Sequence, residues 1–361
     1  MRLVAVERLV SAGDARFDRQ QRFARLGPEG QARLQQSSVL LVGAGALGGS
    51  LAQTLSRCGV GRLVLADRDV VELSNLPRQV LFEESHVGRP KAWAAREALS
   101  RIGGPTRVEA HALHVDADNV EELARGVDLV LDGTDNLATR YLINDLCVES
   151  GRAWIYGGVV GASGLVLPIV PGRGACLRCL FPEPAPPGAL ATCDTAGVVL
   201  PAVALVAACQ SAAALRWLCA DAAGRERFET YLLDLDAWGG HLRRLPAPRD
   251  PDCPCCGRRE FPFLFEAVER SAVALCGRAT VQVRPQLGAA PRADLARLAE
   301  RVAGSARGLV RDESLLAFEV ESLRFTVFAD GRALIEGTSD VERAGALFER
   351  ALPAASPRGG A

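Results

Sequence analysis

The sequence lacks an excess of charge of either sign: its 361 residues include 42 Lys+Arg and 43 Asp+Glu. A broad nucleic-acid-binding surface needs surplus Lys and Arg to neutralise phosphates, so this composition argues against nucleic acid as a partner. Low-complexity composition is lacking too, because the 36 Gly and 20 Pro are about 16% of the chain, below the roughly 25–30% typical of such segments. We therefore expect an ordinary globular protein, long enough for two domains.

Long apolar runs are also lacking. Positions 1–23 contain no uninterrupted apolar segment of the kind that signal peptides carry. The most apolar stretch, residues 196–215, is interrupted by Pro201, Gln210 and Ser211, whereas a membrane span needs ~20 predominantly apolar residues. We expect a buried core helix there, no membrane association and a cytoplasmic location. In that reducing compartment the 11 cysteines more often bind metal than form disulfides.

Short apolar runs alternate with helical stretches between residues 38 and 170. This alternation is typical of an α/β fold with a doubly wound, mostly parallel sheet. Asn119 and Glu122 have the spacing of a capping box. The expected strands are 39–42, 63–66, 108–115, 129–131, 154–160 and 165–170, and the expected helices are 49–58, 90–103, 119–126 and 136–149.

The composition changes between residues 245 and 259, where four prolines and three cysteines cluster. Beyond this break the pattern predicts a small α+β domain. Its expected elements are a strand-like run over 272–283, a helix at 293–302, paired strands at 316–321 and 324–329, and a helix at 341–351. The predicted division is a first domain over 1–259, a second over 260–353 and a disordered tail over 354–361.

A glycine loop follows the first expected strand and opens the next helix. It contains Gly43, Gly45 and Gly48, and such glycines let the backbone approach a phosphate while the helix N-terminus supplies N–H donors. Asp67 lies 19 residues after Gly48, at the end of the next strand, where an acid can bond a ribose hydroxyl. These features predict a Rossmann-like nucleotide site and leave open which nucleotide it binds.

Four further motifs stand in order along the chain. They are Arg16-Phe17-Asp18-Arg19-Gln20, Ser74-Asn75-Leu76-Pro77-Arg78-Gln79, Gly88-Arg89-Pro90-Lys91 and Asp132-Gly133-Thr134-Asp135-Asn136. Together with the glycine loop they resemble the ThiF/MoeB/E1 superfamily, whose members adenylate the C-terminal glycine of ubiquitin-like proteins. The resemblance extends from about residue 16 to 257. It is strongest to bacterial members of molybdopterin-synthase and thiamine pathways.

The resemblance implies a role for each motif residue. Asp67 would bind the ATP ribose, and Asp135 would hold Mg2+. Arg19 matches an arginine that a family dimer lends to the neighbouring subunit's triphosphate, which implies an isologous homodimer. The triphosphate would be bound by Asn75, Arg78 and Lys91. This set agrees with elementary chemistry, because a triphosphate needs fixed cations and Mg2+ prefers carboxylate and phosphate oxygens.

The chemistry needs no general base. A glycine α-carboxylate has a pKa of roughly 3.3–3.7, so it is already an anion at neutral pH and can attack the α-phosphate. The protein has only to position two anions and offset their repulsion. The absence of a candidate catalytic histidine near these motifs is therefore no objection to adenylation.

Two C-x-x-C pairs carry the second strong signal. Cys176 with Cys179 and Cys253 with Cys256 supply four thiolates, a ligand set typical of structural zinc. The two pairs are more widely separated than in a zinc ribbon. Redox-active or unligated cysteines are the alternative, and Cys255 stays open as a further ligand. Four protein sulfurs leave no open coordination position, so the predicted zinc knuckle is structural.

Cys193 matches a mobile-loop cysteine of the family. In E1 enzymes and some sulfur-transfer members that cysteine forms a covalent link to the carrier. A loop thiol without a catalytic duty is the alternative, and both interpretations stay open because adenylation itself uses no thiol.

The function implied is ATP-dependent adenylation of a small β-grasp sulfur carrier ending in Gly-Gly, in molybdopterin or thiamine biosynthesis, with release of pyrophosphate. The alternative is activation of another ubiquitin-like modifier, or of a small-molecule carboxylate, by the same chemistry. An NAD-dependent dehydrogenase would leave Arg78, Lys91 and Asp135 without a task. An inactive partner of a heterodimeric E1 would lack the phosphate-binding residues that are present here.

Overall fold

The computed structural model describes residues 12–186, 189, 191–265, 272–274, 279–283, 293–311, 315–329 and 331–351. The chain divides into two compact units, Met1–Ala267 and Val268–Ala361. The predicted tail at 354–361 lies outside the described residues.

The first unit is built around an eight-stranded sheet in the order β3-β2-β1-β4-β5-β6-β7-β8. The first five strands run parallel, and β6, β7 and β8 add to the edge as antiparallel strands. The predicted mostly parallel, doubly wound sheet is therefore confirmed. The strands are β1 Ser38–Val42, β2 Arg62–Ala66, β3 Arg107–His111, β4 Leu129–Asp132, β5 Trp154–Val160, β6 Ser163–Ile169, β7 Leu232–Asp236 and β8 His241–Leu245.

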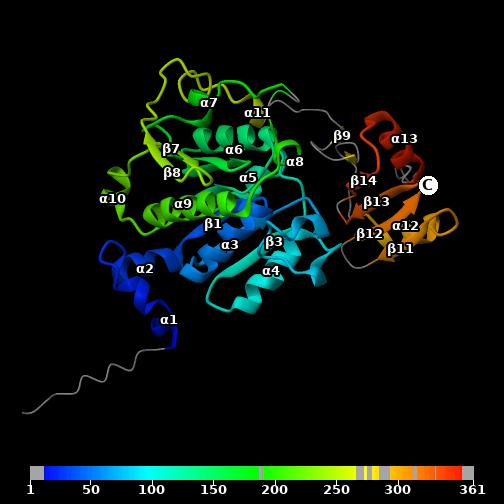
Figure 1. Ribbon diagram of the computed structural model, residues 1–361, viewed down its shortest axis with the longest axis horizontal. Coiled ribbons are helices and arrows are strands. Elements are labelled where there is room, and N and C mark those ends of the chain that lie inside the picture. The colour runs from blue at the N-terminus through cyan, green and yellow to red at the C-terminus, as the bar shows by residue number, and fades with distance from the viewer. Residues whose placement is uncertain are drawn as a thin grey trace, which may run out of the picture. The chain divides into compact units, whose positions relative to one another are not determined.

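Helices cover both faces of this sheet (Figure 1). Val39 and Leu41 of β1 face one helical layer, and Leu40 and Val42 face the other. The first layer contains α2 Gly27–Gln36, α3 Ala46–Cys58, α4 Lys91–Ile102 and α9 Leu200–Leu218. The second contains α5 Val120–Leu123, α6 Leu137–Glu149, α7 Leu177–Leu180 and α11 Pro262–Phe265. The remaining helical segments are α1 Ala12–Gln21, α8 Cys193–Ala196, α10 Ala222–Glu226 and the 3-10 turns Leu73–Asn75 and Glu84–His86.

The order of the strands reverses beside β1. The chain passes from β1 to β2 on one side and returns to β4 on the other, so β1 lies between them. In open α/β sheets, ligands bind at such a switch point, outside the carboxyl ends of the strands. The glycine loop follows β1, and the segment Gly133–Asn136 follows β4, so the fold brings two of the predicted motifs to this point.

Two local predictions are wrong after β2. The third strand ends at His111, four residues short of the predicted Val115. The reason is the Asn119 side chain, which donates to the carbonyl of His114 (2.8 Å) and accepts the N–H of Asp116 (3.1 Å), holding this segment in a turn. The same bonds occupy the Asn119 side chain, so it makes no cap bond to α5 and the predicted capping box does not form.

The most apolar stretch forms α9, which begins at Leu200 instead of residue 196. Val203, Val206 and Ala207 lie on its buried face and join the first core, so the predicted core helix is confirmed. Within the described part of the chain, α9 is the single helix that is long and apolar enough to cross a membrane, judged by length and composition alone. That is weak evidence for a span, because core helices pass the same test.

The second unit contains a six-stranded antiparallel sheet in the order β11-β12-β13-β14-β10-β9. Phe318 and Phe325 stack in its core at 5.1 Å between ring centroids. The single run predicted at 272–283 is two antiparallel strands. The elements are β9 Ala272–Ala274, β10 Thr280–Val283, α12 Leu295–Val302, β11 Arg307–Arg311, β12 Leu315–Val320, β13 Leu323–Phe328, β14 Ala333–Glu336 and α13 Val341–Ala351.

Candidate functional site

The glycine loop between β1 and α3 uses its three glycines for different reasons. Gly43 has φ +90°, and a Cβ there would lie 2.6 Å from the Gly133 carbonyl oxygen. A Cβ on Gly48 would lie 1.9 Å from the Gly43 carbonyl oxygen. A Cβ on Gly45, however, would meet only Gln79 Nε2, at 3.8 Å. The fold therefore demands Gly43 and Gly48, whereas Gly45 leaves open space at the N-terminus of α3, where a phosphate can approach the backbone.

Asp67, at the end of β2, binds the glycine loop directly. Its carboxylate accepts the N–H of Ala44 (2.7 Å, Oδ2) and the N–H of Asp69 (2.7 Å, Oδ1). Burial raises the pKa of Asp67, while the charge of Lys91 and the two backbone hydrogen bonds oppose that rise. The Asp67 carboxylate thus connects the glycine loop to β2. The sequence predicted a contact with the ribose for Asp67, but it did not predict this structural contact.

Lys91 is the first residue of α4 and is almost fully buried, with 3% exposure. Its Nζ lies 3.2 Å from Asp69 Oδ2, and its backbone N–H donates to the Asp69 carbonyl. Lys91 is also the only lysine among the 42 basic residues of the chain. An ammonium is a compact point charge, unlike the planar guanidinium used everywhere else in this chain. That the one lysine of the chain stands at this position is a feature of the sequence that points to a function for Lys91, in addition to the motif spacing.

The motif Ser74–Gln79 lies beside the loop. Asn75 is fully buried, with its Oδ1 accepting the N–H of Glu72 at 3.3 Å. The half-buried Arg78 donates from Nη1 to the carbonyl of Ser74 (2.9 Å). Gln79, which has no role in the sequence-based prediction, is buried with its Nε2 toward Gly45, and within the described chain its Oε1 has no hydrogen-bond partner.

The two aspartates of the segment after β4 differ sharply. Asp132 is fully buried, and it accepts hydrogen bonds from Thr134 N–H (2.8 Å), Thr134 Oγ1 (2.8 Å) and Arg140 Nε (2.9 Å). Asp135 is exposed. The hydrogen bonds of Asp132 therefore fix the shape of the segment. Asp135 faces outward, where its carboxylate can hold a hard cation such as Mg2+.

Arg140 and Gln210 support this segment, and the sequence motifs include neither of them. Arg140 also donates to the carbonyls of Thr134 (2.6 Å) and Gly157 (3.1 Å). Burial lowers the pKa of Arg140, but the charge and hydrogen bond of Asp132 and the nearby Tyr156 and Asp135 together outweigh burial, so the pKa is raised. Gln210, on α9, donates from Nε2 to the Asp132 carbonyl at 2.9 Å.

Arg19 stands apart from these residues. It is exposed on α1, and within the described residues no hydrogen bond or ion pair joins it to the motifs after β1, β2 and β4. The single chain therefore brings together the loop, Asp67, Lys91 and the segment with Asp135, but not Arg19.

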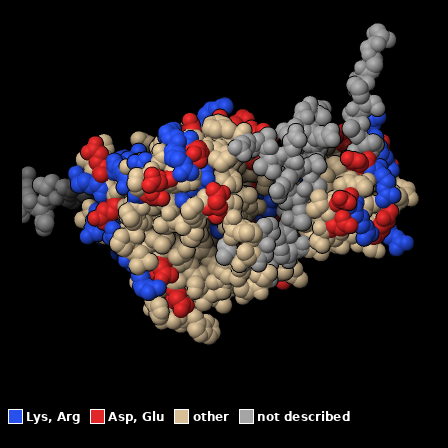
Figure 2. All heavy atoms as spheres, turned by 90° about the horizontal axis from the view of Figure 1, so that it is seen from above, with Lys and Arg blue, Asp and Glu red and all other residues tan. Residues whose placement is uncertain are grey.

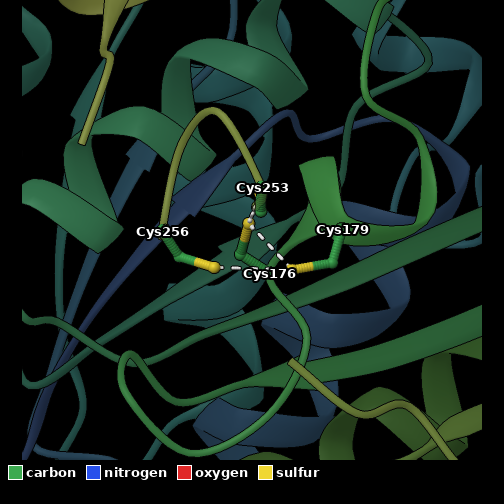
Figure 3. Close-up of side chains that lie close together, drawn as sticks. All are labelled: Cys176, Cys179, Cys253 and Cys256. Atoms are coloured by element: carbon green, nitrogen blue, oxygen red, sulfur yellow. Dashed lines mark hydrogen bonds between the residues drawn. The ribbon is translucent and has the colours of Figure 1, made fainter. Parts of the chain in front are cut away.

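Four cysteine sulfurs form a compact cluster. The Sγ atoms of Cys176, Cys179, Cys253 and Cys256 lie within 4.8 Å of one another and point toward a common centre (Figure 3). Three of the sulfur–sulfur separations are 3.6 Å, 3.8 Å and 3.4 Å. A tetrahedral zinc site with Zn–S of roughly 2.3 Å requires sulfurs about 3.8 Å apart. The donor set and its spacing therefore fit Zn2+.

Cys193 lies outside the four-cysteine cluster. It is the first residue of α8, where Thr192 accepts the N–H of Thr195 as the helix cap. The Cys193 thiol donates to the Val159 carbonyl at 3.1 Å.

Comparison with known proteins adds to this geometry. The ThiF family model matches residues 17–255, which is more than half of the chain. The chain belongs to the ThiF family. This ThiF member is 39% identical over 339 residues to the "Sulfur carrier protein ThiS adenylyltransferase" of Bacillus subtilis, covering 93% of this chain and 98% of that protein. It is 40% identical over 262 residues to the "SAMP-activating enzyme E1" of Haloferax volcanii, covering 72% and 96%.

Solved structures show the same fold. The crystal structure of E. coli MccB with MccA-N7isoASN superposes with a TM-score of 0.59 at 21% identity, over 67% of this ThiF member and 75% of that chain. The Bacillus match is longer than the first unit, so the similarity extends into the second unit as well.

Proposed function

We propose that this ThiF member uses ATP to adenylate the C-terminal glycine of a small β-grasp sulfur carrier and releases pyrophosphate. The observation that carries the proposal is the meeting of the glycine loop, buried Lys91 and exposed Asp135 at the switch point of the sheet. The relative that matches nearly the whole chain is named for ThiS, which favours a carrier of thiamine biosynthesis over one of molybdopterin biosynthesis. A modifier-activating role, as in the name of the Haloferax relative, is the second candidate.

The residues divide the work of the reaction. The glycine loop and the N-terminus of α3 bind phosphate, with Asn75, Arg78 and Lys91 around it, and Asp67 bonds the ribose. A carboxylate oxygen of the carrier forms a bond to the α-phosphorus while the bond to the β-phosphate oxygen breaks, so the products are an acyl-adenylate and pyrophosphate. Mg2+ held by Asp135 would neutralise phosphate charge, and the fixed cations would offset repulsion between the two anions.

The surface charge agrees with a protein partner of modest charge. On the face shown in Figure 2, basic and acidic side chains lie interspersed, as expected for a chain of net charge −1. We propose a cytoplasmic location, because the structural zinc ligands must stay reduced.

Pyrophosphate exchange tests the function. Labelled pyrophosphate should enter ATP only when a carrier ending in Gly-Gly is added, and a carrier lacking the last glycine should give background exchange. Purified thiamine-pathway and molybdopterin-pathway carriers, compared side by side, identify the substrate. Exchange supported by a free small carboxylate without any carrier would contradict the proposal.

Cys193 is proposed to serve a later step than adenylation. We expect Cys193→Ser to retain pyrophosphate exchange within about twofold, because the nucleophile is a carboxylate and a thiolate acts only by attacking the finished acyl-adenylate. Exchange rates together with mass spectrometry under non-reducing conditions check this. A carrier adduct present in the parent and absent in Cys193→Ser supports covalent capture, whereas collapse of exchange in a folded variant would place Cys193 in the adenylation site.

Arg19 is proposed to act on the site of the partner subunit of an isologous homodimer. Arg19→Ala and Asp135→Ala should each be inactive, yet mixing them should restore part of the activity, because a mixed dimer contains one complete site. Subunit exchange followed by the pyrophosphate assay measures this. Arg22→Ala, a change in the exposed arginine one turn further along, is the matched control. No recovery in verified mixed dimers would assign Arg19 to its own chain.

A further inference from the structure

Two adjacent polar residues in the second half of α6 have no part in the nucleotide site. Asn144 and Asp145 are both 0% exposed. A buried amide and a buried carboxylate are costly unless they are bonded. The hydrogen-bond partners of Asn144 and Asp145 therefore show which segments these two side chains hold in place.

The Asn144 amide spans both cysteine-bearing segments. Its Oδ1 accepts the N–H of Leu177 (2.9 Å), between Cys176 and Cys179. Its Nδ2 donates to Cys255 Sγ (3.1 Å), between Cys253 and Cys256. These partners are 33 and 111 residues away in sequence, so one side chain fixes the position of one half of the cluster relative to the other.

Asp145 extends the same attachment. Its Oδ2 accepts the N–H of Phe263 (3.1 Å), at the start of α11. Its Oδ1 lies 3.8 Å from Nη1 of Arg178, a 3% exposed residue between Cys176 and Cys179. Arg178 in turn donates from Nη1 to the carbonyl of Glu260 (3.2 Å), just beyond the second pair. Both cysteine segments are thus joined to α6 by two neighbouring side chains.

Cys255 itself is 0% exposed and is not one of the four clustered sulfurs. We propose that Cys255 is an anchor and not a zinc ligand, and that Asn144 is a positioning residue that holds the two ligand pairs in register for the metal. This inference rests on the zinc site described above. Hydrogen bonds behind the ligands fix their orientation, and losing one typically costs about 10–100-fold in metal affinity.

The test measures zinc release from the full-length, zinc-loaded protein to a chromogenic chelator. Cys255→Ser keeps a hydroxyl that can accept the Asn144 N–H, so it should keep one zinc per chain and the parental release rate. Asn144→Leu should also bind one zinc but release it about 10–100-fold faster. Cys147→Ala, which removes another fully buried side chain of α6, should release zinc at the parental rate.

Several outcomes would overturn the inference. Loss of zinc in Cys255→Ser would make Cys255 a ligand, and parental release from Asn144→Leu would remove the positioning role. If Asn144→Leu does not fold, Asn144→Asp replaces it, because it keeps the acceptor for Leu177 and exchanges the donor to Cys255 for a carboxylate oxygen. Parental release from Asn144→Asp then counts against the role. A parent protein without bound zinc overturns the zinc site itself, and metal analysis before the release assay distinguishes that case.

Discussion

We expect Asp135→Asn to lower carrier-dependent pyrophosphate exchange by a factor of about 10²–10³, the usual loss for one preorganised charge contact. The physical reason lies in the segment after β4. Asp132 is occupied by Thr134 and Arg140, so it cannot take over the cation when Asp135 loses its charge. The loss should be smaller when Mn2+ replaces Mg2+ at high concentration, because the amide oxygen remains a weak ligand.

Lys91→Met should give a loss of similar size for a different reason. It removes a buried ammonium beside Asp69, and this ammonium is also the proposed cationic partner of the phosphates. Because the chain contains one lysine, amine-directed pyridoxal phosphate followed by borohydride has Lys91 as its only side-chain target. Mg·ATP should protect Lys91 from this reagent in the parent protein.

Two controls accompany the variants Asp135→Asn and Lys91→Met. Glu226→Gln removes an exposed carboxylate on α10 and should retain full exchange. Thermal unfolding of each variant separates lost chemistry from lost structure. Near-parental exchange in both Asp135→Asn and Lys91→Met would refute the assigned roles, and labelling of Lys91 that ATP does not slow would place the nucleotide elsewhere.

The meeting of the candidate-site motifs was predictable from the sequence because it follows from strand order. A strand, a glycine loop and a helix over residues 39–58 leave few arrangements, and the acid of Asp67 marks the end of the neighbouring strand. Alternation of strands and helices then predicts a parallel sheet, whose carboxyl ends share one edge. Local sequence spacing was enough to predict these features, because each inference concerns residues that are close together in the chain.

The family resemblance assigns Mg2+ to Asp135 and gives Asp132 no role, and spacing alone does not distinguish the two aspartates. Both residues precede the same helix, and only burial against Arg140 and the Gln210 amide separates them. Gln210 is 78 residues from Asp132, beyond the reach of any local pattern. The end of β3 at His111 was missed for a related reason, since the Asn119 side chain bonds to the turn before it and not to the helix after it.

The cysteine pairs show the same limit. Spacing predicted two C-x-x-C ligand pairs, but it offered no means of deciding whether Cys255 belongs with them. That decision depends on Asn144, 111 residues away in sequence. Contacts over such separations are set by the packing of α6 against the sheet, which the sequence predicts as a helix without specifying its partners.

The largest change in stability is expected from loss of a clustered cysteine. Cys176→Ser should lose zinc and lower the melting temperature by on the order of 10 °C, because the free energy of metal binding is also folding free energy and 1 kcal/mol shifts melting by roughly 2–4 °C in a domain of this size. The cluster joins residues 77 positions apart, so its loss frees the segment after β8 as well as α7.

Cys193→Ser is the matched control for Cys176→Ser, since it makes the same chemical change in a cysteine outside the cluster. It should keep one zinc per chain and the parental melting temperature, measured by metal analysis and by calorimetry. Chelation of zinc from the parent should reproduce the melting curve of Cys176→Ser, because both treatments remove the same cross-link. If Cys176→Ser kept its zinc and melted with the parent, these four sulfurs would not be the metal site, and stability would rest on the two cores that flank the sheet.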